Sequence, residues 1–230
     1  MPGVEVVKGE AFFACQALTD IECGKLKFIR SRAFCVCNSL SSVDLSSIEI
    51  VENRAFSGCT ALTNVKFGKE LESIGEGAFM NCRLERITIP LKDGMITRDN
   101  VFQGCGNLKH VDLVEGVHDE TITALLLEAW KKDMNEEIAS INQILPTAPA
   151  GDIYSQEDVG EKGRAIRTWI RSVLRHIIEY KAQHQSYLNE AATTLQLALP
   201  SDIVIKNVLP FLELPSYTFQ GEGSEGESTA

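Results

Sequence analysis

Cysteine and histidine are the residue types in this sequence that could support metal binding or nucleophilic chemistry. The chain has 7 cysteines and 4 histidines among its 230 residues. No Cys-x-x-Cys pair occurs and no two histidines are four residues apart, so the ligand spacings typical of zinc sites are missing. Five of the cysteines instead recur every 22 or 23 residues. This regular spacing indicates a structural repeat.

Motifs of the common enzyme classes are also missing from the sequence, including H-E-x-x-H, G-x-S-x-G and a Walker loop. Residues 221–226 spell G-x-G-x-x-G, but no strand is expected before them, and the neighbouring glutamates would repel a phosphate. We therefore predict that the protein is not an enzyme and that it has no catalytic residues, cofactor or metal.

The recurring cysteines have two further interpretations, because thiols on neighbouring repeats could form disulfides and Cys35-x-Cys37 could be half of a metal site. A free cysteine is small and readily buried, however, which favours a purely structural column. Cys35 falls outside every predicted buried column, and we expect it to be the most reactive thiol. An odd number of cysteines also favours a reducing compartment.

The element that positions the cysteines is a repeat whose clearest copy is residues 55–67, AFSGCTALTNVKF. A period in the low twenties with an L-x-x-V-x-L core is typical of a leucine-rich repeat solenoid. In each copy the aromatic and the cysteine have helix-turn spacing, and the later apolar pair alternates as in a strand. Stacked copies predict a ladder of about five parallel strands. Five copies align on their aromatic residue, at Phe12, Phe34, Phe56, Phe79 and Phe102.

The full pattern, I-x-x-x-A-F-x-x-C-x-x-L-x-x-V-x-L, resembles the BspA-like leucine-rich repeat family over about residues 6–116. Members of that family occur as bacterial surface proteins and in unicellular eukaryotes, and they are implicated in protein binding and adhesion. The resemblance implies a non-catalytic interaction or scaffold module whose partner is another protein.

A leucine-rich repeat usually binds its partner with the exposed residues of its strands. On the last three predicted strands these residues are polar and include no aromatic side chain. A partner held there should itself be polar, and its affinity should depend on salt. The candidate partner-binding residues of these strands are Asn64, Lys66, Arg86, Thr88, His110 and Asp112.

Helical spacing replaces the repeat after residue 116. An apolar stripe from Ile122 to Ile141, with Asp119 as its N-cap, predicts an amphipathic helix that covers the last repeat. We thus expect an α+β chain, a short solenoid followed by an all-helical C-terminal region. Its predicted segments are a solenoid at 1–116, a capping helix at 117–145, a linker at 146–163, a helical region at 164–214 and a disordered acidic tail at 215–230.

A long helix from residue 164 to about 199 has one apolar face and a second face that carries arginines. It could bind a partner such as calmodulin or lie on an anionic membrane. Alternatively, its apolar face packs on the preceding helix or on a second copy of itself. Self-association would make the chain a structural, oligomerising element. Its candidate partner-binding residues are Arg164, Arg167, Trp169, Arg171 and Arg175.

The string LPSDIVIKNVLPFL at residues 199–212 resembles the opening of an F-box, a helical module that docks substrate receptors onto ubiquitin ligases. The resemblance covers fourteen of the roughly forty residues of such a module. It implies an adaptor in ubiquitin transfer as a third functional alternative.

Composition restricts the partners and the location of the protein. A net charge of −10 argues against a nucleic-acid partner, and no apolar run is long enough to span a membrane. The N-terminal residues lack the apolar core of a secretory signal. Together with the odd number of cysteines, this predicts a cytoplasmic protein.

Overall fold

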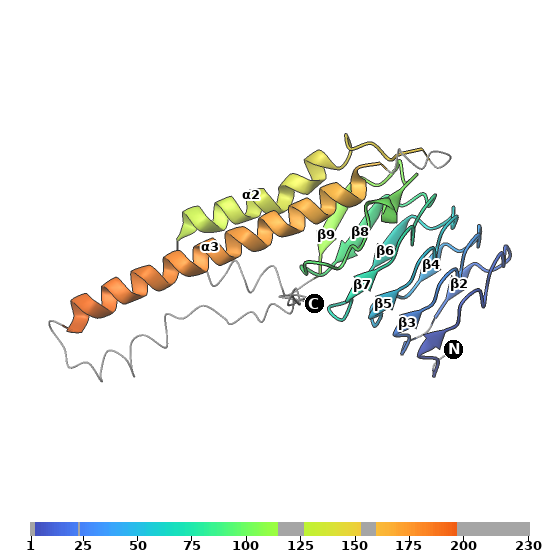
Figure 1. Ribbon diagram of the computed structural model, residues 1–230, viewed down its shortest axis with the longest axis horizontal. Coiled ribbons are helices and arrows are strands. Elements are labelled where there is room, and N and C mark those ends of the chain that lie inside the picture. Colours follow the sequence, from blue (N-terminus) through green and yellow to red (C-terminus); the bar gives the residue numbers. More distant parts are fainter. Residues whose placement is uncertain (1–2, 23, 115–126, 153–159, 197–230) are drawn as a thin grey trace, which may run out of the picture.

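The computed structural model describes residues 3–22, 24–114, 127–152 and 160–196. Residues up to 114 form the predicted solenoid, and two helices follow it in the described part of the chain (Figure 1). The fold class expected from the sequence is therefore confirmed. Asp119, the F-box-like string at 199–212 and the acidic tail at 215–230 lie outside the described residues.

The predicted strands form a ladder along one side of the solenoid. We call it the second ladder, because its strands come second in their repeats. Its strands are parallel and pair in the orders β2-β4 and β6-β8-β9, and a bridge between Leu45 and Phe67 connects the two groups. The strands of the second ladder are β2 (Asp20–Ile21), β4 (Ser42–Val43), β6 (Asn64–Lys66), β8 (Arg86–Ile89) and β9 (His110–Leu113).

A further set of strands, which we call the first ladder, was not predicted. We expected one strand in each repeat, but most repeats contain two. The additional strands pair in parallel in the order β1-β3-β5-β7, and a bridge from Ile74 to Ile96 continues the ladder. They are β1 (Val6–Val7), β3 (Phe28–Ile29), β5 (Ile50–Val51) and β7 (Ser73–Ile74). The apolar residues of β1, β3 and β5 are adjacent in the sequence and do not alternate with polar ones, so they lack the period of a half-buried strand.

Columns of equivalent side chains fill the space between the two ladders. The phenylalanine rings stack from repeat to repeat, with centroids 5.2 Å apart for Phe12 and Phe34 and 5.3 Å apart for Phe34 and Phe56. Stacked at this distance, the rings contribute packing beyond the area they bury. The core is therefore a set of continuous columns, and each repeat depends on its neighbours.

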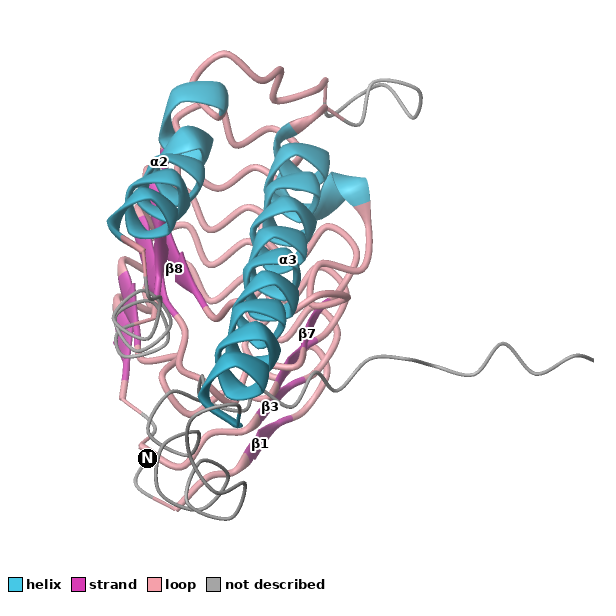
Figure 2. Cartoon of the chain, turned by 90° about the vertical axis from the view of Figure 1, so that its left-hand side faces the viewer, coloured by secondary structure: helices cyan, strands magenta, loops and turns pink. Residues whose placement is uncertain are grey.

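Helices α2 (Glu128–Ile144) and α3 (Lys162–Gln196) run side by side and cover the last repeat (Figure 2). Met134 and Ile141 of α2 are buried, and α2 packs on β9 as predicted. The side-chain oxygen Oδ1 of Asn142 accepts a 2.8 Å hydrogen bond from the backbone N–H of Val111. A helix thus supplies the partner that the next repeat would have supplied to the last strand.

The boundaries of the helical region differ from the prediction. We expected the first helix to begin near Ile122, but α2 begins at Glu128, after Leu127 in an extended conformation. The segment predicted as a linker, residues 146–163, is hydrogen-bonded to the solenoid both before and after its undescribed part. The carbonyl of Ala150 accepts from the N–H of Gly104 at 2.8 Å, and Lys162 is the first residue of α3.

Lys162 connects three parts of the chain and is only 2% exposed. Its ammonium group Nζ donates to the carbonyl of Leu108 in the last repeat at 2.7 Å and to the carbonyl of Leu145 at the end of α2 at 2.9 Å. Burial lowers the pKa of this lysine. None of the helices in the described part of the chain has the length and hydropathy needed to cross a bilayer.

Candidate interaction surfaces

The six candidate residues of the second ladder lie next to one another on its outward face. Parallel pairing sets Asn64 beside Arg86 and Arg86 beside His110, and it sets Lys66, Thr88 and Asp112 in a second row. The Arg86 guanidinium and the Asp112 carboxylate form an ion pair of 2.5 Å. This surface is polar throughout, and exposed ion pairs of this kind contribute little free energy.

The outward face of the first ladder differs from that of the second, because it carries a row of apolar residues. Val6, Phe28 and Ile50 are neighbours in register, and each points away from the core while the next residue of its strand points inward. Val6 is 41% exposed, and Phe28 and Ile50 are partly exposed. We call Val6, Phe28 and Ile50 the apolar row.

Paired charges border the apolar row on both sides. On one side Lys27 and Glu49 form an ion pair of 2.9 Å. On the other side Arg30 pairs with Glu52, and its guanidinium lies 5.4 Å from the centre of the Phe28 ring. The apolar centre and the charged border together resemble the usual anatomy of a protein interface.

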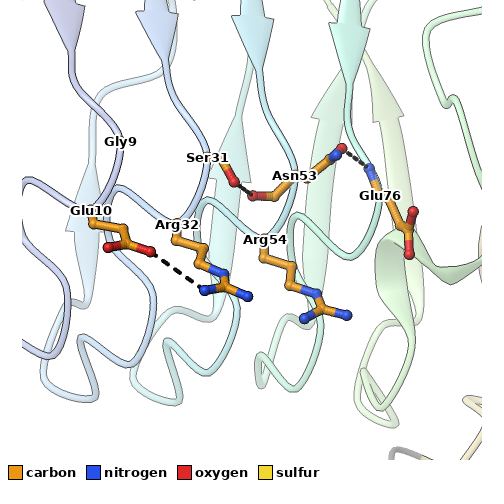
Figure 3. Close-up of a pocket in the computed structure, with 7 residues that line it drawn as sticks. All are labelled: Gly9, Glu10, Ser31, Arg32, Asn53, Arg54 and Glu76. Carbon is orange, nitrogen blue, oxygen red and sulfur yellow. Dashed lines mark hydrogen bonds and ion pairs between the residues drawn. The ribbon is translucent and has the colours of Figure 1, made fainter.

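A polar trough begins where the strands of the first ladder end (Figure 3). It has a volume of about 550 Å³ and is open to solvent. The side chains of Arg32 and Arg54 lie side by side along it, with Glu10 before them and Glu76 after them. Its lining residues are Gly9, Glu10, Ser31, Arg32, Asn53, Arg54 and Glu76.

Comparison with known proteins identifies the repeats. Residues 2–109 match the model of the BspA type leucine rich repeat region, in 6 copies. The solenoid is a BspA-type leucine-rich repeat region. The expected family resemblance is therefore confirmed for this part of the chain. No curated protein matches the chain.

Three solved structures are similar to the BspA-type region. A leucine-rich repeat protein from Bacteroides ovatus is 30% identical, with a TM-score of 0.42, over 48% of this chain and 29% of that one. A leucine rich cell surface protein from Faecalibacterium prausnitzii is 25% identical, with a TM-score of 0.43, over 49% and 30%. A leucine-rich repeat protein from T. pallidum is 20% identical, with a TM-score of 0.38, over 54% and 78%. The chain thus spans less than a third of the length of the first two.

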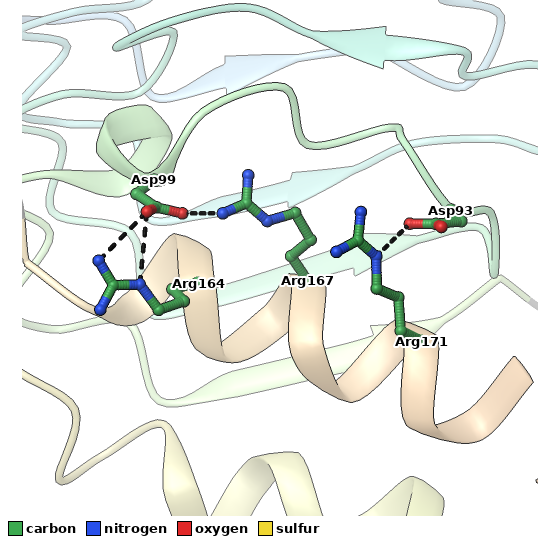
Figure 4. A network of polar contacts seen from close by, with 5 residues as sticks. All are labelled: Asp93, Asp99, Arg164, Arg167 and Arg171. Atoms are coloured by element: carbon green, nitrogen blue, oxygen red, sulfur yellow. Dashed lines mark hydrogen bonds and ion pairs between the residues drawn. The ribbon is translucent and has the colours of Figure 1, made fainter. Parts of the chain in front are cut away.

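The arginines predicted on the long helix bind residues of the BspA-type region (Figure 4). Arg164 and Arg167 both bind the carboxylate of Asp99, and Arg171 binds Asp93 at 3.0 Å. Both aspartates come from the segment between β8 and β9. These three arginines therefore fasten α3 to the solenoid.

The two remaining candidates on α3 also have partners within the chain. Trp169 is 4% exposed and its indole N–H donates to the carbonyl of Glu137 at 3.0 Å, so it is a core residue and not a contact for a partner. Arg175 lies 3.9 Å from Glu179 on the surface of the same helix. Of the five candidates, Arg175 remains the one without a bond to another element among the described residues.

Most of the apolar face of α3 is buried against α2 and the last repeat, and Ile178 is its exposed member at 53%. This confirms the interpretation that the face packs within the chain. Ile166, Ile170 and Val173 are at most 2% exposed. The exposed apolar surface that would favour self-association through this helix is therefore much smaller than the sequence indicates. Oligomerisation through α3 stays a prediction.

The cysteine column of the BspA-type region is structural, as predicted. Each buried thiol donates to the carbonyl of a phenylalanine in the preceding repeat, as Cys37 does to Phe12 at 2.9 Å and Cys59 to Phe34 at 3.1 Å. Burial raises the pKa of Cys59 to about 12. The thiols thus fill the core and also connect successive repeats.

We expected Cys35 to be the most reactive thiol, but among the described residues Cys15 is more exposed. Cys35 is partly buried, and burial raises its pKa, although Arg32 and Arg54 nearby act in the opposite direction. Cys15 is exposed, because it belongs to the first repeat and has a neighbouring repeat on one side only among the residues that the structure describes.

The sequence contains a signal for the apolar row. The pairs Val6-Val7, Phe28-Ile29 and Ile50-Val51 recur every 22 residues, and in each pair the second residue belongs to the buried column of the repeat. Three apolar residues at equivalent positions beside a buried column indicate a strand with an exposed apolar face. The trough had a weaker signal, because its arginine recurs in two consecutive repeats only, as Arg32 and Arg54.

Proposed function

We propose that this chain is a non-catalytic protein-interaction module that binds another protein through the outward face of the first ladder. The single observation that carries this proposal is the apolar row of Val6, Phe28 and Ile50. It lies partly exposed between bordering ion pairs on a set of parallel strands. The BspA-type repeats support an interaction role in general terms.

The chemistry of the apolar row suits a partner that contributes apolar side chains of its own. Aromatic residues are enriched at the centres of protein interfaces, and Phe28 is the aromatic member of the row. Full burial of a phenylalanine side chain contributes about 1.5–3 kcal/mol. Because Phe28 is already partly covered, its loss should weaken binding by at most about 100-fold.

The border residues would give such an interface its orientation. Arg30 and Glu52 are paired in the free protein, and they can exchange this contact for a charge on the partner. That the partner is another protein and that the chain is cytoplasmic stay predictions.

A selection with a library of random displayed peptides tests the proposal. We expect peptides that bind the wild-type protein to be rich in apolar residues and to be lost on Phe28→Ser. A second variant, Ile50→Ser, removes another member of the apolar row. The matched control is Asn64→Ala, which changes an exposed residue of the second ladder, and thermal unfolding of each variant verifies its fold.

Retention of the peptides by Asn64→Ala together with their loss from both variants of the apolar row would support the proposal. Peptides that survive both of those variants but are lost on Asn64→Ala would instead assign binding to the second ladder. Failure to enrich any peptide on the wild-type protein would also count against the proposal.

A further inference from the structure

The trough beside the first ladder places two positive charges next to each other. Arg32 and Arg54 occupy the same position in consecutive repeats, and the spacing of parallel strands sets such positions about 4.8 Å apart. Their side chains point the same way along the trough (Figure 3). Positive side chains presented from neighbouring positions repel each other unless an anion lies near both.

The backbone of the repeat fixes the direction of both side chains. Arg32 and Arg54 have left-handed φ angles of 55° and 56°, and Glu10 at the equivalent position of the first repeat has 58°. Their N–H groups bond to the next repeat, since Arg32 donates to the carbonyl of Asn53 at 3.1 Å and Arg54 to that of Glu76 at 2.9 Å. The two arginines are therefore presented from a rigid base.

The contacts of the two guanidinium groups leave donors available. Arg32 shares one long contact of 3.4 Å with Glu10. Arg54 forms no ion pair with any residue that the structure describes. Asn53, on the wall of the trough, accepts a 2.8 Å bond from the N–H of Glu76 through Oδ1, which leaves its amide Nδ2 as a further donor.

We propose that Arg32 and Arg54 bind a compact oxyanion on a side chain of the partner protein, either the carboxylate of an acidic residue or a phosphoryl group. This proposal rests on the proposed function, because the trough continues the surface of the apolar row. Guanidinium groups bind carboxylate and phosphate oxygens in a bidentate manner, and charge-assisted bonds of this kind are the strongest in proteins.

The ends of the trough restrict the size of the anion. Glu10 and Glu76 place negative charges before and after the arginine pair. A nucleic acid or a sulfated polysaccharide would extend over these carboxylates and be repelled by them. A single side chain with one anionic group fits between them, so the partner sequence should combine apolar residues with one acidic or phosphorylated residue.

Titration of the wild-type protein with sodium acetate and, separately, with inorganic phosphate tests the anion site without any partner. The Nε–H signals of Arg32 and Arg54 in NMR spectra report binding, and sodium chloride at equal ionic strength is the reference. We expect saturable shifts of both signals, with acetate and phosphate distinguishing a carboxylate from a phosphoryl ligand. Removing one guanidinium should weaken this binding about 10- to 100-fold.

Arg54→Gln and Arg32→Gln are the test variants, and each keeps the length and polarity of the side chain. Arg86→Gln is the matched control, since it removes an exposed arginine from the second ladder. Loss of the saturable shifts in the first two variants and their retention in the third would support the site. Shifts that do not saturate in the wild type, or that are equal in all variants, would overturn it.

The two proposals can fail separately. If peptides selected on the apolar row bind Arg54→Gln as tightly as the wild type, the anion site is wrong and the binding face is unaffected. If Phe28→Ser loses no peptide but still binds acetate or phosphate, the binding face is wrong and the anion site remains.

Discussion

The two ladders of the solenoid have the same interior but different exteriors. Ile29 in the first ladder and Ile87 in the second are both fully buried in equivalent rows. Outside, the first ladder has the apolar row and the arginine trough, whereas the second has polar residues and the Arg86–Asp112 pair. The difference shows that the repeat constrains the inward residues and leaves the outward ones free to differ.

The largest expected effects test whether the two interiors are equivalent. We expect Ile29→Ala and Ile87→Ala each to lower the free energy of unfolding by about 2–5 kcal/mol, because each leaves a cavity in a packed column. Urea unfolding of the two variants measures this. Ile29→Val and Ile87→Val are controls that should cost only about 0.5–1.5 kcal/mol. A much smaller loss for Ile29→Ala would mean that the first ladder contributes little to stability.

An intermediate effect is expected where the second ladder meets the helices. Asn142→Ala removes the acceptor of the Val111 N–H and should cost about 1–3 kcal/mol, since a partly buried donor is left without a partner. Gln143→Ala, at the exposed neighbouring position, should change stability by no more than about 0.5 kcal/mol. Equal effects of the two substitutions in thermal unfolding would contradict the role of α2 as the cap of this ladder.

The smallest expected effects compare one exposed ion pair from each ladder. Asp112→Ala removes an exposed ion pair and should cost about 0.2–1 kcal/mol, with the cost falling as salt rises. Glu52→Ala should cost more, because Glu52 also accepts a 2.8 Å hydrogen bond from the N–H of Ser31. Chemical unfolding at low and high salt would compare the two variants. If both lost the same stability and salt abolished both losses, the hydrogen bond from Ser31 to Glu52 would contribute nothing.

The sequence predicted those parts of the fold that repeat. Phe34, Phe56 and Cys59 recur at a constant step, and the structure places each of them in a buried column. The first ladder was missed because its apolar residues stand next to each other and do not alternate with polar ones, although these apolar pairs do recur.

The docking of the helical region could not be predicted from patterns, because it depends on single contacts between distant residues. Lys162 reads as a solvated lysine in the sequence, and its burial depends on backbone carbonyls 54 and 17 residues away. Similarly, Arg171 meets Asp93 across 78 residues. One charged residue carries no periodic signal that would reveal such a partner.

The candidate surfaces were likewise predictable where their residues repeat and unpredictable where they depend on single contacts. The six residues of the second ladder were brought together as expected, since their spacing repeats with the strands. Trp169 was misassigned because an amphipathic helix does not reveal which of its faces the rest of the chain covers. The trough depends on an arginine that occurs in two repeats only, between two repeats that carry Glu10 and Gly77 at that position.

Photo-crosslinking tests the central claim, that binding occurs on the first ladder, most directly. A benzophenone side chain is placed at position 28 in one protein and at position 88 of the second ladder in another. Each is irradiated with a peptide selected on the wild-type protein. We predict a crosslink from position 28 and none from position 88. A crosslink from position 88 alone would contradict the account.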